Sequence, residues 1–198
     1  MTPAPLSPAA PVGATNEALP EKVHYGCGGN VREGWLNVDA FKKYYLWDQV
    51  AANTKERILD ADLTLAHPFP DGSFRFGQAE DFLEHLDQAE SLIFLAEAYR
   101  TLQPGGVLRL SFPGLYGVLC WHYRKADYQG AVIGQKEAYT QWNHKHFYCL
   151  ESLQVVARHL GFKSVVEKPF GESDHPELRG LETRREQITL NLIVELTK

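Results

Sequence analysis

The stretch Lys22-Val23-His24-Tyr25-Gly26-Cys27-Gly28-Gly29-Asn30 is a short apolar segment that opens into closely spaced glycines. Glycines let a backbone turn tightly and approach a ligand without an intervening Cβ. Asp39 ends the next short apolar segment, and a carboxylate at that place in an α/β sheet can bind two ribose hydroxyls. The pattern indicates a loop that cradles a nucleotide; the alternative is a plain turn between two strands.

The spacing between the glycines and the acidic residue is short. Eleven positions separate Gly28 from Asp39, whereas a dinucleotide fingerprint places its acidic residue about 20 residues on. Parallel strands are normally joined by a dozen or more residues. We therefore expect a shortened first crossover, which argues against a nicotinamide-binding unit.

Composition limits the class of protein. The 198 residues, 44% hydrophobic and 23% charged, suit one globular domain. A net charge of −5 argues against a general nucleic-acid binder. The three cysteines are too widely spaced for a disulfide framework or a paired zinc motif, so a reducing compartment is expected. No run of 18 apolar residues occurs, and we expect no ordinary membrane span.

The first 20 residues differ in composition from the rest. They contain five prolines, many alanines and no lysine or arginine. They lack the charged start and apolar centre of a secretory signal. We expect a disordered leader over residues 1–20, one domain over residues 21–198, and a cytoplasmic location.

From residue 22 onward, short apolar runs alternate with amphipathic stretches, which predicts an α/β sheet with helices on its faces. A helix is predicted over Gln88–Leu102, opened by a capping box of Asp87 and Glu90. A second is predicted over Glu151–Leu160 and ended by Gly161. The predicted strands are Val23–Tyr25, Leu36–Asp39, Ile58–Asp62, Phe74–Ala79, Val107–Phe112, Phe162–Lys168 and Ile188–Thr197.

The order of these elements predicts their directions. Strands that follow helices along the chain are expected to be parallel and joined by helical crossovers. The last strand, Ile188–Thr197, follows the polar stretch Pro169–Glu186 without an apolar helix, and suits an antiparallel return. The expected fold class is therefore α/β: a single doubly wound, mostly parallel sheet with an antiparallel last strand and a shortened first crossover.

Five segments in order carry a further signal. They are His24–Gly28, Gly34–Asp39, Asp62–Leu63 with Pro68–Phe74, Phe82–Leu86, and Tyr99–Leu108. Together they resemble the small S-adenosylmethionine-dependent methyltransferases with a Rossmann-like fold, the type 11 group, over about residues 22–198. The resemblance implies that the last strand lies antiparallel between the fifth and the sixth. It also implies S-adenosylmethionine as cofactor and methyl transfer to a small-molecule acceptor such as a sugar or a secondary metabolite.

The resemblance also implies roles for residues of the cofactor site. Gly26 and Gly28, with Cys27 between them, would lie against the methionine part, and Asp39 would hold the ribose hydroxyls. Asp62 and Leu63 would flank the adenine. Backbone near Ala79 and Glu80 would close the pocket.

Three histidines are candidate catalytic bases: His85, His144 and His146. A neutral histidine can take the proton of an oxygen or nitrogen acceptor near pH 7. The resemblance places the loop of His85 beside the sulfonium; the alternative for Glu84 and His85 is a polar approach to the helix. No metal is expected at His144-Lys145-His146, because no carboxylate or thiol lies nearby at ligand spacing.

Two further segments leave alternatives open. Gly114–Tyr148 mixes aromatic residues with histidines, which suits an acceptor site, a cover for the sheet edge or a dimer contact. Gly171–Gln187 is expected to be a solvated loop or short helix; alternatively Arg179 or Arg184 binds an anionic acceptor. The aromatic residues are Tyr116, Trp121, Tyr123, Tyr128, Tyr139, Trp142, Phe147 and Tyr148.

Two other functions remain to be weighed against methyl transfer. One is a cofactor-binding or partner-binding module that keeps the fold and transfers nothing, because a fold does not fix a function. The other is a nicotinamide dehydrogenase. The sequence does not give the acceptor or the oligomeric state, for which a homodimer is one option.

Overall fold

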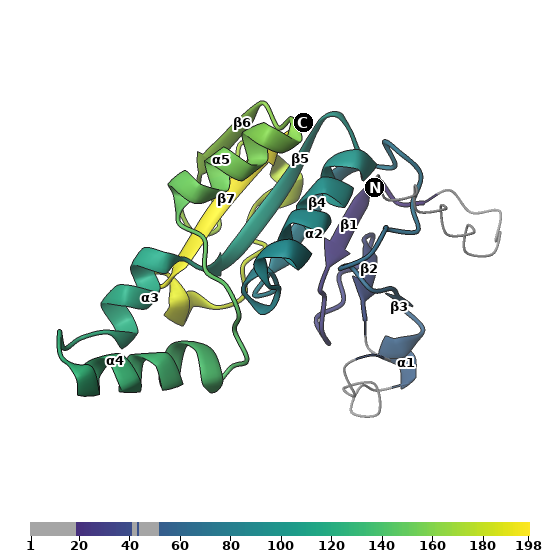
Figure 1. Cartoon of the computed structure of the whole chain (residues 1–198). Helices are drawn as coiled ribbons and strands as arrows, with labels where there is room; N and C mark the ends of the chain where they lie inside the picture. Colours follow the sequence, from purple (N-terminus) through teal and green to yellow (C-terminus); the bar gives the residue numbers. More distant parts are fainter. Residues whose placement is uncertain (1–18, 41–42, 44–51) are drawn as a thin grey trace, which may run out of the picture.

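The computed structural model describes residues 19–40, 43 and 52–198. Within them, seven strands form one sheet in the order β3-β2-β1-β4-β5-β7-β6 (Figure 1). Every predicted strand is present, with ends shifted by a few residues. The strands are β1 (Lys22–Tyr25), β2 (Leu36–Asp39), β3 (Ile58–Asp60), β4 (Phe74–Glu80), β5 (Leu102–Pro113), β6 (Ser164–Glu167) and β7 (Asn191–Thr197). Most of the predicted leader lies outside the described residues.

The strand directions confirm the expected fold class. β3, β2, β1, β4 and β5 are parallel to one another, whereas β7 is antiparallel to both β5 and β6. β7 therefore lies between the fifth and sixth strands, as the resemblance implies. Residues 26–35, which join β1 to β2, contain turns and no helix, so the shortened first crossover is confirmed.

The helices are α1 (Ala52–Lys55), α2 (Gln88–Thr101), α3 (Leu115–His122), α4 (Tyr128–Gln135) and α5 (Leu150–Leu160). The capping box at the start of α2 is confirmed: the Asp87 carboxylate accepts from the Glu90 N–H at 2.8 Å, and Glu90 accepts from the Asp87 N–H at 2.9 Å. Gly161 ends α5 in the left-handed conformation, with φ of 104°. No helix in the described part of the chain has the length and apolar character that crossing a bilayer requires.

One face of the sheet carries α2 and α5, which run side by side across it (Figure 1). Phe94 and Leu95 of α2 and Leu153 of α5 are fully buried against Leu108 and Leu110 of β5. Each such side chain stabilises the fold by about 1.5–3 kcal/mol relative to its exposed state. This core holds the carboxyl ends of β1, β4 and β5 in a fixed relation to one another.

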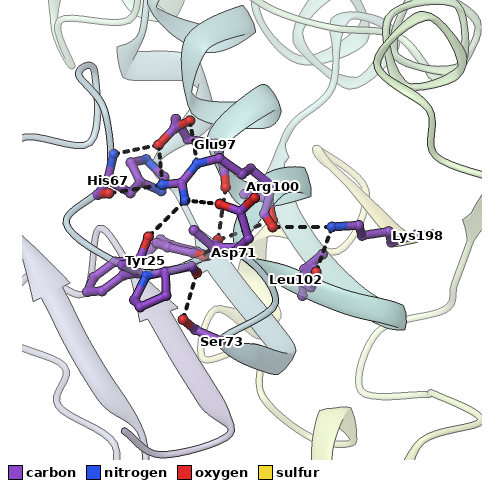
Figure 2. A network of polar contacts seen from close by, with 12 residues as sticks. Tyr25, His67, Asp71, Ser73, Glu97, Arg100, Leu102 and Lys198 are labelled. Carbon is purple, nitrogen blue, oxygen red and sulfur yellow. Dashed lines mark hydrogen bonds and ion pairs between the residues drawn. The ribbon is translucent and has the colours of Figure 1, made fainter. Parts of the chain in front are cut away.

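The connection from β3 to β4 is tied to the last turns of α2 by a polar network (Figure 2). The Arg100 guanidinium donates to Glu97 and Asp71, both at 2.7 Å, and to the backbone carbonyls of His67 and Phe69. Glu97 in turn accepts from the backbone N–H of His67 at 2.7 Å. These contacts fix the turn that starts β4 and are structural.

The opposite face is covered by the segment between β6 and β7. Leu178, in a 3₁₀ turn (Pro176–Leu178), is fully buried with Phe76 and Val107. The expectation of a solvated stretch was therefore wrong for part of this segment. Its Glu182 is also buried and pairs with Arg109 of β5, which donates to Glu195 of β7 as well, at 2.7 Å. Other 3₁₀ turns are Leu83–His85 and Arg185–Gln187, and a π-helical turn is Lys136–Thr140.

Candidate active site

Two adjoining cavities lie at the carboxyl edge of the sheet. The glycine-loop cavity, of about 440 Å³, is lined by residues that follow β1, β2 and β4. The aromatic cavity, of about 660 Å³, lies between α3, the π-helical turn and the segment before β7. Asp81, His85 and Trp142 line both. Ligands in the two cavities would meet at these three residues.

The glycine loop has the backbone that its sequence predicts. Gly26 and Gly28 both have positive φ, 59° and 52°. A Cβ on Gly26 would stand 2.3 Å from Cδ2 of Phe82, whereas a Cβ on Gly28 would meet nothing within 4 Å. The Gly28 N–H donates to Oδ2 of Asp39 at 2.7 Å, and the Ala40 N–H donates to Oδ1 of Asp39 at 2.7 Å.

The two carboxylates of this cavity have different surroundings. Burial raises the pKa of Asp39, and the backbone hydrogen bonds from Gly28 and Ala40 act against that rise. Partial burial also disfavours ionisation of Asp62, but its hydrogen bonds from Lys43 and Thr64 outweigh burial and hold its pKa below the usual range. Asp62 accepts from Lys43 at 2.7 Å and from the Thr64 hydroxyl at 2.6 Å.

Not all of the predicted cofactor residues line the glycine-loop cavity. The structure brings together there Gly26, Gly28, Asp39, Asp62 and Leu63. Three others do not line it: Cys27 is buried against Ile58, Ala79 is buried within β4, and Glu80 accepts hydrogen bonds from Thr183. β4 runs to Glu80, one residue beyond the predicted strand, so the residues that face the cavity begin at Asp81 and Phe82.

Asp81 is a site residue that sequence reasoning missed. It has a positive φ of 48°, which is uncommon for a residue other than glycine and concentrates at functional sites. Burial raises the pKa of Asp81 to about 6, against the opposing charge of Arg184, whose Nε lies 2.9 Å from the carboxylate. The available signal was its position two residues after the end of a predicted strand, where ligand-binding residues of α/β sheets gather.

The aromatic cavity divides the predicted aromatic segment into two groups. Trp121, Trp142 and Phe147 line the cavity, and Trp142 is at the same time exposed to solvent. Tyr116 and Tyr128 are exposed and do not line the cavity. The helices α3 and α4, which this segment forms, were not among the predicted elements.

Two of the three candidate bases reach the aromatic cavity. His85 and His144 line it, with ring centroids 4.9 Å apart. His146 lines neither cavity, and its ring lies edge-on to Tyr148 at 4.5 Å. Burial lowers the pKa of His144 to about 4, and burial also lowers that of His85, so both rings are neutral near pH 7.

The hydrogen bonds of these two rings define their tautomers. Nδ1 of His144 lies 2.8 Å from the backbone carbonyl of Ala138, and Nδ1 of His85 lies 3.4 Å from that of Asn143. A carbonyl oxygen only accepts, so each Nδ1 carries the proton and each Nε2 keeps its lone pair. Nε2 is therefore the atom of each ring that can accept a proton or bind a cation.

Acidic side chains outnumber basic ones in the lining of the aromatic cavity. Four carboxyl groups line it, against the single guanidinium of Arg184, and burial raises the pKa of one of them, Glu84, well above its usual range. Arg179 does not line it and donates instead to the backbone carbonyl of Ser173 at 2.7 Å. This lining favours a neutral or cationic ligand over an anionic one. The four carboxyl groups are those of Asp81, Glu84, Glu137 and Glu186.

A sheet whose last strand returns antiparallel between the fifth and sixth is the topology of the Rossmann-like methyltransferase fold. Three solved structures of this class share the fold. One is an S-adenosylmethionine-dependent methyltransferase from Thermotoga maritima, titled a possible histamine N-methyltransferase, at 18% identity and a TM-score of 0.57, with 90% of this chain and 82% of that one covered. Another is an S-adenosylmethionine-dependent methyltransferase from Mesorhizobium loti, at 16% sequence identity and a TM-score of 0.57. The match covers 93% of this chain and 94% of that one. The third is phosphoethanolamine N-methyltransferase 2 from Haemonchus contortus, in complex with phosphomonomethylethanolamine and S-adenosylhomocysteine. It has 13% sequence identity and a TM-score of 0.52, and the match covers 92% of this chain and 49% of that one.

The sequence itself matches a family model described as a methyltransferase domain, over residues 23–110. This match covers β1 to β5 and includes the glycine loop. Over these residues the chain is similar to a methyltransferase domain, and its fold is that of the S-adenosylmethionine-dependent methyltransferases named above. No curated protein matches the chain in sequence.

The glycine-loop cavity has the features that S-adenosylmethionine requires. Its volume lies in the range of about 300–1,000 Å³ that small-ligand sites occupy. A carboxylate offers about four acceptor positions, and backbone N–H groups use two of those on Asp39, so two remain for a pair of hydroxyls. Asp39, Asp62 and Asp81 outnumber the one lysine of the lining, Lys145, which suits a cationic sulfonium.

Proposed function

We propose that this methyltransferase binds S-adenosylmethionine in the glycine-loop cavity and transfers its methyl group to a small molecule in the aromatic cavity. The observation that carries the proposal is the shared wall of Asp81, His85 and Trp142. The sulfonium is already activated, so the chain needs mainly to align the acceptor atom with the bond that breaks. The thioether that bound S-adenosylmethionine would become is a neutral leaving group, so its departure would need no side chain of this protein.

For the cofactor, the proposed contacts follow the lining of the cavity. Gly26 and Gly28 lie against the methionine part, and Asp39 binds the ribose hydroxyls. Asp62 and Leu63 flank the adenine. Asp81 and Phe82 take the closing position that the resemblance implied for Ala79 and Glu80. Cofactor binding to variants of these residues tests the proposed contacts.

For the acceptor, the proposed class is a neutral or cationic molecule with a planar or sugar-like body. Trp121, Trp142 and Phe147 offer stacking and apolar contact, and the surrounding carboxylates accept hydrogen bonds from hydroxyl or ammonium groups. Nε2 of His85 is the proposed acceptor of the proton that the substrate loses, because His85 alone among the candidate bases lines both cavities. His144 is the second candidate, and His146 has no proposed contact with the acceptor.

The decisive experiment has two parts. Calorimetric titration with S-adenosylmethionine tests the cofactor site, and release of S-adenosylhomocysteine with a panel of sugars, phenolic metabolites and amines tests transfer. His85→Ala is expected to lower the rate of transfer at least tenfold at saturating cofactor, while His159→Ala, an exposed histidine on α5, leaves it unchanged. Cofactor binding without transfer to any acceptor would instead favour a non-catalytic binding module.

Three broader features of the chain stay proposals. A single domain over residues 21–198 is supported by the one sheet that runs from β1 to β7. A cytoplasmic location is a sequence-based prediction, which cell fractionation tests. The oligomeric state is open, with a homodimer as one option, and analytical ultracentrifugation measures it.

A further inference from the structure

The wall of the aromatic cavity contains a carboxylate and two imidazoles that face one another. One ligand atom from each of Glu84, His85 and His144 lies within 4.8 Å of the other two. Nε2 of His85 is 4.0 Å from Oε1 of Glu84. Glu84 and His144 are 60 positions apart in the chain. For this reason the sequence around His144 and His146 showed no carboxylate at ligand spacing.

Glu84 lacks a partner for part of its side chain. The residue is only 1% exposed, and its Oε2 has no hydrogen-bond partner among the described residues. A buried carboxylate without a partner is costly for the fold, and such groups are normally paired or bound to a metal. Because Glu84 also lines the cavity, a cation that enters from the cavity can supply the missing partner.

The two imidazoles are held as metal ligands are held. In proteins, a ligating histidine usually donates its other ring N–H to a carbonyl or carboxylate, which fixes the tautomer and the ring orientation. Nδ1 of His144 lies beside the Ala138 carbonyl and Nδ1 of His85 beside that of Asn143, so the two Nε2 lone pairs remain available.

The local charge also suits a cation. Of the charged residues that line the aromatic cavity, four are acidic and one, Arg184, is basic. Arg184 is paired with Asp81 at 2.9 Å. Lys145, which follows His144, is paired with Glu90 at 2.8 Å. Both nearby cationic side chains are thus compensated by a carboxylate of their own.

We propose that Glu84, His85 and His144 bind a divalent transition-metal ion of the Zn²⁺ type, with a coordination position open to the aromatic cavity. Two histidines and one carboxylate form a donor set that such ions take in proteins. Tetrahedral geometry at about 2.0–2.1 Å needs ligand atoms about 3.4 Å apart, so the side chains close by roughly 1 Å on binding. The half-exposed ring of His85 has room for this rotation.

A bound ion would make the cavity prefer acceptors that carry an oxygen or nitrogen ligand atom, a preference that its aromatic side chains do not provide. With the ion bound, Nε2 of His85 would be a ligand and not a base. The open position of the ion would instead bind an oxygen or nitrogen atom of the acceptor and lower its pKa, so that its proton is lost to water. The metal site goes beyond the proposed methyl transfer, since it stands on the side chains of the cavity and not on the cofactor. Metal binding and cofactor binding can therefore fail separately.

The test titrates the metal-stripped full chain with Zn²⁺ by calorimetry, and with Co²⁺ while visible absorption is recorded. We expect one ion per chain, and a Co²⁺ spectrum of the intensity that four-coordinate nitrogen and oxygen ligation gives. His144→Ala and Glu84→Gln are expected to weaken binding by about 100-fold or more, since even groups that only orient ligands contribute 10–100-fold. His159→Ala is expected to bind like the unaltered chain.

Two results would overturn the site. In the first, the variants His144→Ala and Glu84→Gln bind Zn²⁺ and Co²⁺ with the affinity of the unaltered chain. That result would place the ion elsewhere on the surface. The other is the absence of saturable binding to the unaltered chain. Circular dichroism of each variant shows that it is folded, and titration of the same samples with S-adenosylmethionine reports the cofactor site independently. Glu84→Gln keeps the shape of the side chain, so it remains informative if His144→Ala fails to fold.

Discussion

Replacing Gly26 with alanine should damage the glycine loop more than the same change at Gly28. Both residues have positive φ, so alanine costs about 1–2 kcal/mol of conformational strain at either position. Only at Gly26 would the new methyl group overlap a neighbour, the ring of Phe82 at 2.3 Å. Phe82 packs edge-on against Phe94 at 5.1 Å and cannot retreat freely, which adds about 1–3 kcal/mol of overpacking. The total for Gly26→Ala is about 2–5 kcal/mol.

A double-mutant cycle separates the two contributions. In a Phe82→Ala background the overlap is gone, so Gly26→Ala should cost only its strain, and the coupling between the two changes should be about 1–3 kcal/mol. Urea unfolding followed by tryptophan fluorescence measures each corner of the cycle. Equal losses for Gly26→Ala and Gly28→Ala, within about 0.5 kcal/mol, together with no coupling to Phe82, would refute this account of the loop.

Three other expectations concern single side chains. Asp39→Asn can accept only one of the two backbone N–H bonds and loses its charge, so calorimetry should show S-adenosylmethionine affinity weakened by about 10–100-fold; an unchanged affinity would contradict the ribose role. Burial lowers the pKa of His67 to about 4 in the fold, below its ordinary value of 6.5, so its contribution to stability is present above pH 6.5 and is lost as the pH falls toward 4. His144, whose pKa is also lowered to about 4, adds a loss of stability in the same pH range. Urea unfolding should therefore show a loss between pH 7 and pH 5 that is smaller by about 2 kcal/mol in His67→Phe than in the unaltered chain, and an equal loss in both would contradict the burial of a neutral His67. Arg109→Met leaves two buried carboxylates without their cation, and the free energy of unfolding should fall by about 3–5 kcal/mol; a neutral result would show that the network is not needed for stability.

The sequence predicted the sheet well because each strand is a short apolar run bounded by turn residues. The capping residues of α2 and the glycine after α5 are equally local signals, and the structure confirms both. The helices α3 and α4 were missed because aromatic residues and glycines interrupt their apolar spacing; Gly117 and Gly130, for example, lie where backbone or side-chain atoms approach closely. Their helical state depends on packing that a local pattern does not show.

The site was predictable only where it depends on strand ends. Gly26, Gly28 and Asp39 each follow or end a strand, so their meeting at one edge follows from parallel pairing. Asp81 was missed because β4 continues one residue further than its apolar pattern suggests. The approach of Glu84 to His144 comes from segments that are distant in the chain, and no spacing rule predicts it.

The position of β7 between β5 and β6 has a consequence for synthesis of the chain. β6 leaves the ribosome before β7, yet within the described sheet β7 is its only neighbour. Until β7 emerges, β5 therefore presents a bare hydrogen-bonding edge, and β6 has no strand to join. Such edges pair readily with other chains. The nascent protein therefore has an unpaired edge on β5 until β7 has been synthesised, and pairing of β7 with β5 and β6 closes that edge.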